Sequence, residues 1–305
     1  MSLGMALPAG LVQTNAMRGP EGIAWLERLP AIVAHCAQQW SLALEPPFPH
    51  ISINYAAPAV RADGTAAVLK VCFPSREFYT EAEALRLFAG RGAIHLLAAD
   101  LERGALLLER VRPGSALHTV ADDREAARIA ATVMRRLWRP VPAGHTFPAL
   151  GDWMRNMATK APQIIGQSGA FPYRWIERAL ELHRQLSASL VEPVLLHGDL
   201  HHENILAAER EPWLAIDPFG VVGEPVSETG PLLLNAVPSG ADLAATRRIL
   251  TRWVDHLASE LGADRVRLAA WGVVRWVLAN YWTVEDHGAV SEADFYGAQV
   301  LEEML

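Results

Sequence analysis

A short polar loop between apolar segments carries the residues of this chain best suited to chemistry. The apolar run 194–196 is followed by residues 197–204, whose sequence is HGDLHHEN, and by a second apolar run, 205–208. A turn at 209–212 then leads to a third run that ends at Asp217. The second and third runs predict an antiparallel hairpin, which returns its exit close to its entry. We therefore expect Asp217 to lie beside Asn204, with Asp199 on the same loop.

Three oxygen-bearing side chains at one end of a hairpin suit phosphoryl transfer. Magnesium prefers hard oxygen ligands and takes one or two protein side chains, with phosphate oxygens and water completing the octahedron. Asp217 and Asn204 match that requirement. Asp199 is then left to orient the acceptor hydroxyl and take its proton. Two alternatives are less consistent with the whole set: a turn built on Asp and Asn, and a metal cluster of the three loop histidines. We expect His197 to shape the loop through backbone hydrogen bonds instead.

Nucleotide binding requires a cation for the phosphates, and Lys70 is the candidate. It stands late in a strand-like run, 66–73, that precedes a predicted helix. An acidic helix residue would fix its ammonium group; Glu81 is our first choice, and Glu83 stays open. Backbone groups at Glu109 and Val111, where the two lobes are expected to join, could hydrogen-bond adenine.

These segments resemble a known family. Residues 197–204 resemble the HGDLHxxN signature of the aminoglycoside phosphotransferase superfamily, in which Asp217 matches the magnesium aspartate and Lys70 the nucleotide lysine. Residues 215–225 (AIDPFGVVGEP) are similar to the aminoglycoside/hydroxyurea resistance kinase family, which includes streptomycin 6-phosphotransferases. Segments 90–93 and 106–110 add to the resemblance, which spans about residues 40–290. It implies a protein-kinase-like bilobal fold, ATP and Mg²⁺.

The acceptor is less sharply predicted than the phosphate machinery. His202 and Glu203 stand where many relatives carry proline or glycine, and Glu228 stands where aspartate is common. Carboxylates expected on the acceptor side are Glu224, Glu228, Glu285 and Asp286. They would pair with a small cationic substrate, and the resemblance makes an aminoglycoside such as streptomycin the first candidate. A metabolic kinase for an amino alcohol, sugar or amino acid is the alternative, and a silent nucleotide-binding protein is disfavoured by the complete residue set.

The predicted elements define an α+β protein of two lobes. Residues 1–111 form the nucleotide-binding lobe, in which helices accompany an antiparallel sheet; Pro30 is expected to break the helical run 21–40. Predicted strands cover 50–55, 66–73, 94–98 and 105–111, with a helix from Ser75 to about Phe88. Residues 112–305 form the catalytic and substrate-binding lobe, with helices over 121–137, 150–158, 175–189, 241–260 and 264–282 around the strands of 194–216.

Composition limits the partners. The formal net charge is −7 and no Lys/Arg run occurs, which argues against nucleic acid. The most apolar stretch, 266–282, contains two arginines, so we expect a buried helix and no membrane span. With two cysteines and no signal-peptide pattern, the chain is expected in the reducing cytoplasm. The oligomeric state stays open.

Overall fold

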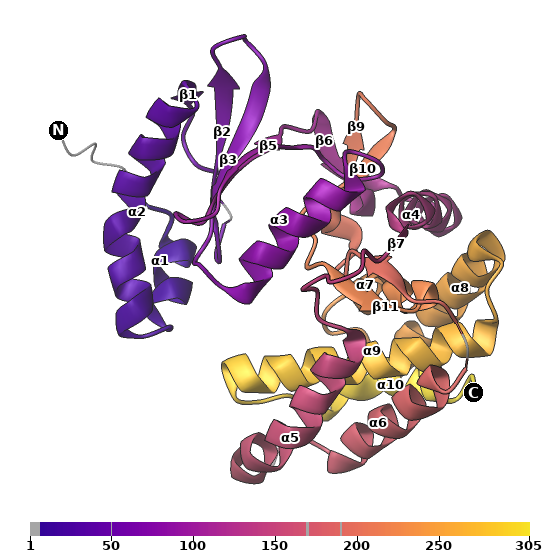
Figure 1. Cartoon of the computed structure of the whole chain (residues 1–305). Coiled ribbons are helices and arrows are strands. Elements are labelled where there is room, and N and C mark those ends of the chain that lie inside the picture. Colours follow the sequence, from indigo (N-terminus) through magenta and orange to yellow (C-terminus); the bar gives the residue numbers. More distant parts are fainter. Residues whose placement is uncertain (1–6, 50, 169–170, 190) are drawn as a thin grey trace. The chain divides into compact units, whose positions relative to one another are not determined.

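The computed structural model describes residues 7–49, 51–168, 171–189 and 191–305, and of residues 166–168, 286 and 287 only the backbone (Figure 1). The chain divides into two compact units, Met1–Arg112 and Pro113–Leu305, one residue from the predicted boundary. Helices combine with antiparallel sheets in the chain, which confirms the predicted α+β class.

The first unit contains a five-stranded antiparallel sheet in the order β1-β2-β3-β5-β4. Its strands are β1 (Leu42–Leu44), β2 (Tyr55–Arg61), β3 (Ala66–Val71), β4 (Leu96–Asp100) and β5 (Ala105–Glu109). The predicted hairpin at Asp63 and Gly64 is confirmed: Gly64 has φ +82° and the Asp63 carboxylate accepts the Thr65 N–H at 3.0 Å. The predicted strand over 50–55 is wrong for Ile51–Asn54, since β2 begins at Tyr55; residue 50 lies outside the described residues.

Three helices accompany this sheet: α1 (Ala9–Ala16), α2 (Pro20–Gln39) and α3 (Arg76–Phe88). The predicted break at Pro30 is wrong, because α2 continues through it. A proline inside a helix costs about 3 kcal/mol. The buried face of α2, which includes Trp25, Leu29 and Val33, joins the core of the sheet. Each such side chain stabilises by roughly 1.5–3 kcal/mol on burial, so packing outweighs the lost hydrogen bond.

The second unit has two small antiparallel sheets, in the orders β10-β9-β6 and β11-β8-β7. Their strands are β6 (Pro113–Ala116), β7 (Arg139–Pro140), β8 (Val194–Leu196), β9 (Ile205–Ala208), β10 (Trp213–Ala215) and β11 (Val221–Gly223). The predicted hairpin is confirmed, since β9 and β10 pair antiparallel from Ala207 opposite Trp213 to Ile205 opposite Ala215. The polar loop leaves one sheet at the end of β8 and enters the other at β9, so both sheets hold it.

Helices form the rest of the second unit. They are α4 (Asp123–Leu137), α5 (Leu150–Ser168), α6 (Tyr173–Ser187), α7 (Thr229–Ala236), α8 (Leu243–Leu261), α9 (Arg265–His287) and α10 (Tyr296–Glu302). The predicted helix over 150–158 was too short, because α5 continues to Ser168 with Pro162 inside it. Helix α9 packs against α5, α6, α7, α8 and α10, and this central place explains its apolar sequence (Figure 1). No helix in the described ranges is both long enough and apolar enough to cross a bilayer.

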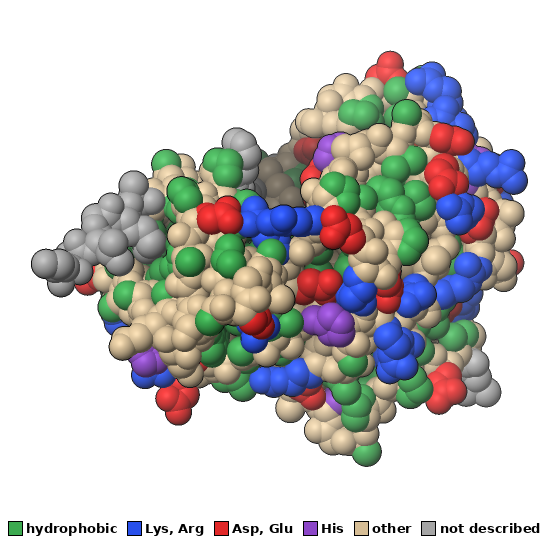
Figure 2. All heavy atoms as spheres, turned by 90° about the horizontal axis from the view of Figure 1, so that it is seen from above, with side chains coloured by type: hydrophobic (Ala, Val, Ile, Leu, Met, Phe, Trp, Pro, Cys, Tyr) green, Lys and Arg blue, Asp and Glu red, His purple; other side chains and the backbone are tan. Residues whose placement is uncertain are grey.

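Charges of both signs are mixed on the surface shown in Figure 2. Basic and acidic side chains alternate there, with apolar side chains between them, and no broad field of one sign covers that face. A nucleic-acid site would present a basic stripe.

Candidate active site

Lys70 of β3 and Glu81 of α3 form a buried ion pair in the first unit. The Nζ–Oε1 distance is 2.6 Å, and the two side chains are 6% and 8% exposed. The choice left open between Glu81 and Glu83 therefore falls on Glu81. A buried ammonium needs such a partner, because an unpaired charge is costly to desolvate. The pair holds the lysine in a defined position.

The predicted adenine-binding segment lies at the end of β5. The backbone N–H of Glu109 donates to the carbonyl of His95 at 2.9 Å, and its carboxylate accepts the His95 N–H at 2.9 Å. The Glu109 N–H is thus already bound within the unit. A backbone N–H that donates to adenine would therefore have to be that of Val111. This residue follows β5 and is half-buried.

In the second unit, Ile216 ties the polar loop to the hairpin. Its N–H donates to the Asn204 carbonyl at 3.0 Å, which brings Asp217 beside Asn204 as expected. Its carbonyl accepts from Nε2 of His197 at 2.7 Å. Nδ1 of the same ring accepts the Asp199 N–H at 3.2 Å, so the ring is a neutral imidazole with its hydrogen on Nε2. This confirms that His197 shapes the loop through backbone hydrogen bonds.

The backbone of Asp217 is in the left-handed region, with φ +56°. An L-residue other than glycine pays about 1–2 kcal/mol for this conformation. It persists because the N–H and the carbonyl of Ile216 are both bound. The residue is exposed, so its carboxylate is accessible to a ligand.

Asp199 lies on the same loop, with its side chain 33% exposed. Burial raises its pKa above the usual value for aspartate, and the nearby Asp217 carboxylate raises it further, whereas His201 and Arg275 oppose the shift. Nε2 of His201 lies 3.6 Å from Oδ2 of Asp199. A carboxylate with a raised pKa accepts a proton more readily, which suits a general base that stays within reach of solvent.

Asn204 and Asp217 fit a magnesium ion that is shared with a phosphate ligand. Nδ2 of Asn204 donates to the Asp199 carbonyl at 2.9 Å, which directs its Oδ1, the atom that binds metals, away from that carbonyl. Within the described ranges no three His, Cys, Asp or Glu side chains cluster closely enough to hold a metal by themselves. One carboxylate and one amide oxygen are the usual protein share for Mg²⁺ when phosphates supply the remainder.

The prediction that Glu228 contacts substrate does not hold. The residue is 1% exposed, and its carboxylate accepts the N–H groups of His197 and Gly198 at 2.6 and 2.9 Å. Burial raises its pKa to about 7. Glu228 supports the polar loop from within, and a substrate cannot reach it.

The other predicted substrate carboxylates differ in availability. Glu224 is bound by the guanidinium of Arg267 and by the indole N–H of Trp271, so its expected role is also not supported. Glu285 pairs with Lys160 at 3.3 Å and its side chain is 32% exposed. The side chain of Asp286 lies outside the described part of the chain.

Sequence reasoning missed Arg275. Its Nη2 donates to the Gly198 carbonyl at 2.8 Å, and the residue is only 6% exposed. The arginine itself could have indicated a buried polar contact, because charged residues inside an apolar helix are almost never buried without a partner.

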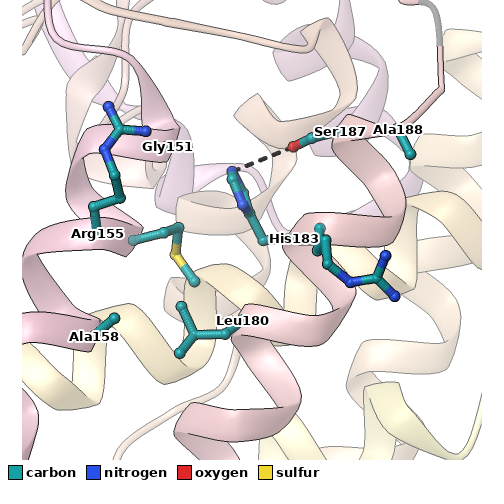
Figure 3. Close-up of a pocket in the computed structure, with 9 residues that line it drawn as sticks. Gly151, Arg155, Ala158, Leu180, His183, Ser187 and Ala188 are labelled. Carbon is teal, nitrogen blue, oxygen red and sulfur yellow. Dashed lines mark hydrogen bonds between the residues drawn. The ribbon is translucent and has the colours of Figure 1, made fainter.

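A separate pocket of about 440 Å³ lies between α5 and α6 and includes Gly151, Arg155, Leu180 and His183 (Figure 3). His183 contacts Ser187 there at 3.4 Å, and burial lowers its pKa. None of the candidate site residues lines this pocket, so we do not assign the chemistry to it.

Comparison with known proteins gives a consistent result. The sequence model of the family described as "Aminoglycoside/hydroxyurea antibiotic resistance kinase" matches residues 52–287. The chain is 35% identical to a streptomycin 6-kinase of Streptomyces griseus, over 92% of this chain and 91% of that protein. It is 36% identical to a hydroxyurea phosphotransferase of Kitasatospora aureofaciens, over 97% and 85% of the two chains.

Solved structures show the same fold at low sequence identity. A choline/ethanolamine kinase family protein from Mesorhizobium loti has a TM-score of 0.61 and 14% identity, covering 90% of this chain and 92% of that one. A mutant aminoglycoside phosphotransferase in ternary complex with ADP and hygromycin B has a TM-score of 0.59 and 15% identity, with coverage of 89% and 95%. These similarities confirm the predicted protein-kinase-like fold.

Proposed function

This chain belongs to the aminoglycoside/hydroxyurea antibiotic resistance kinase family, and we propose that it transfers the γ-phosphoryl group of ATP to a hydroxyl group of a small molecule. The observation that carries the proposal is the loop that holds Asp199, Asn204 and Asp217 together at one end of the β9–β10 hairpin. This set matches what phosphoryl transfer from a metal–nucleotide complex requires.

Each residue has a distinct role in this proposal. Lys70, oriented by Glu81, binds the α- and β-phosphates, and the backbone at Glu109 and Val111 binds adenine. Asn204 and Asp217 would hold Mg²⁺, which would neutralise charge on the phosphates. Asp199 orients the acceptor hydroxyl and takes its proton as the new O–P bond forms and the bond to the ADP oxygen breaks. The sequence has only two cysteines and both are buried, which suits the reducing cytoplasm, where we expect the reaction to occur.

We propose a cationic, polyhydroxylated acceptor, with streptomycin the first compound to test. Relatives named as streptomycin 6-kinases support this choice. Of the predicted substrate carboxylates, Glu285 and Asp286 are the two left to pair with such a cation, because Glu224 and Glu228 are bound inside the protein. A guanidinium group of the substrate could exchange with Lys160 as the partner of Glu285.

The acceptor is tested by assaying phosphate transfer to streptomycin, other aminoglycosides, hydroxyurea, choline, homoserine and simple sugars under equal conditions. We expect transfer to streptomycin, with a KM that rises with salt because exposed charge pairs are screened. Preferred transfer to a neutral sugar, with a KM independent of salt, would contradict the cationic acceptor and leave the kinase assignment intact.

Mg-ATP is expected to raise the melting temperature of the protein, because a ligand that binds only the native state stabilises it. At ten times its Kd the gain is about 1.4 kcal/mol, or roughly 2–4 °C for a chain of this size. Thermal melts with ATP, with and without Mg²⁺, measure the effect. Asp217→Ala should lose the contribution of the metal, and an unshifted parent at millimolar Mg-ATP would argue strongly against the proposal.

Glu81→Gln is expected to raise the KM for ATP about tenfold, a loss of about 1.4 kcal/mol, because the neutral amide no longer fixes the Lys70 ammonium. Glu83→Gln is the matched control, since it makes the same change two residues along the same helix. Steady-state kinetics with varied ATP distinguish the two. An equal effect of both variants would rule out a specific role for the Lys70–Glu81 pair.

A further inference from the structure

Arg275 makes a polar contact with the catalytic loop from a distant part of the sequence. It lies on α9, and its Nη2 donates to the carbonyl of Gly198, the residue before Asp199, at 2.8 Å. Gly198 is itself buried. The side chain reaches this carbonyl across 77 residues of sequence. Its Nη1 is buried and has no hydrogen-bond partner within the described part of the chain.

The surroundings of Arg275 hold its guanidinium in one place. The group lies over the rings of Trp153 and Trp282, 5.2 and 5.7 Å from their centroids. Trp153 comes from α5, which packs against α9 as α7 does (Figure 1). A Cβ at Gly230 of α7 would overlap the aliphatic part of Arg275, so a glycine there leaves room for the arginine. Aromatic faces attract cations, and the planar guanidinium stacks on them in a way that an ammonium group does not.

Glu228 binds the same loop at the two peptide groups that precede the one bound by Arg275. Its carboxylate accepts the N–H groups of His197 and Gly198, whereas Arg275 donates to the carbonyl of Gly198. The carboxyl group of Glu228 therefore faces the N–H groups of His197 and Gly198, and the guanidinium of Arg275 faces the carbonyl of Gly198. Gly198 has φ +89°, and a Cβ there would lie 2.8 Å from Cγ1 of Val221, so this conformation is accessible only to glycine. The Arg275 guanidinium therefore holds the carbonyl of the peptide that leads into Asp199, and Nδ1 of His197 accepts the N–H of that peptide.

We propose that Arg275 is a positioning residue for the base: through the Gly198 carbonyl it sets the orientation of the peptide that carries Asp199. The inference rests on the proposed function, because it assigns to Arg275 an effect on phosphoryl transfer. Without the guanidinium, the Gly198 carbonyl loses its hydrogen-bond donor in a buried place. Asp199 then samples other orientations. A displacement of about 1 Å at a reacting group can lower the rate about a hundredfold.

The test compares Arg275→Gln and Arg275→Lys with Arg267→Gln. Arg267 is a matched control because it lies two turns earlier on α9 and also binds a carboxylate, Glu224, and a backbone carbonyl, that of Leu186. We expect Arg275→Gln to lower kcat roughly ten- to a hundredfold and to leave the KM for ATP within about threefold. Arg275→Lys should recover part of kcat, because it keeps the charge. Arg267→Gln should lower thermal stability and keep kcat within about twofold.

Hydrogen exchange of peptides covering residues 194–200 gives a second measurement that needs no acceptor. Arg275→Gln should speed amide exchange in this segment in the folded protein, whereas Arg267→Gln should not. A parental kcat, or unchanged exchange in the loop, in folded Arg275→Gln would overturn the inference. If the parent and Arg267→Gln transfer no phosphate to any acceptor, the proposed function fails instead, and the exchange data still decide whether Arg275 holds the loop.

Discussion

Asp199→Asn is expected to lower kcat by a factor of about 100 or more and to leave binding of Mg-ATP close to that of the parent. The amide keeps the size of the carboxylate and cannot accept the proton of the acceptor hydroxyl. Because Nδ1 of His197 and Nδ2 of Asn204 bind the backbone of Asp199, and not its carboxylate, the loop should keep its shape in the variant. Single-turnover phosphate transfer on the best acceptor measures the chemical step, and calorimetric titration with Mg-ATP measures binding.

Comparison with Asp217→Ala distinguishes the loss of the metal ligand from the loss of the base. This variant should lose both turnover and the magnesium-dependent part of nucleotide binding, since it removes a ligand and not the base. Parental turnover by Asp199→Asn would show that the base is assigned wrongly. Equal losses of Mg-ATP affinity in the two variants would show that Asp199 also binds the metal.

Glu228→Ala is expected to lower the free energy of unfolding by about 3 kcal/mol and to lower turnover strongly. The change leaves the buried N–H groups of His197 and Gly198 without an acceptor and removes one of the two carboxyl groups, with Asp199, whose charge favours the buried Arg275 guanidinium. Urea denaturation measures the stability of the variant. Glu228→Asp is the control, because it keeps a carboxylate on a shorter side chain and should be affected less.

Glu228 also predicts a pH dependence of stability. Burial raises the pKa of its carboxyl group from 4.5 to about 7, so between these values the folded state holds a proton that the unfolded state has lost. Stability from this group is therefore fully present below about pH 4.5 and falls as the pH rises to about 7, by about 3 kcal/mol in total. In Glu228→Gln this component should vanish, so the difference between parent and variant should change across the window. A difference that is independent of pH would exclude the raised pKa.

The polar loop is held both by contacts between residues near in sequence and by contacts from distant residues, and only the first kind could be predicted. Residues 197–217 are contiguous, and a hairpin pairs its own ends, so the approach of Asp217 to Asn204 followed from the sequence pattern. Glu228 and Arg275 reach the loop from 30 and 77 residues away from Gly198. No periodicity of a single sequence encodes which distant side chain meets which backbone group. Glu228 was therefore predicted on the substrate side, although it is buried.

The same difference between local patterns and long-range packing explains which other predictions were correct and which were wrong. The sequence by itself determined the α+β class and the β2–β3 and β9–β10 hairpins, because turn chemistry and strand periodicity act over a few residues. Tertiary structure decided the continuity of α2 through Pro30, since burial of its apolar face outweighs the lost hydrogen bond. It also decided that Glu81 pairs with Lys70 and that Glu224 pairs with Arg267. A charged side chain takes the partner that the packed elements place beside it, and desolvation makes that choice strong only where both groups are removed from water.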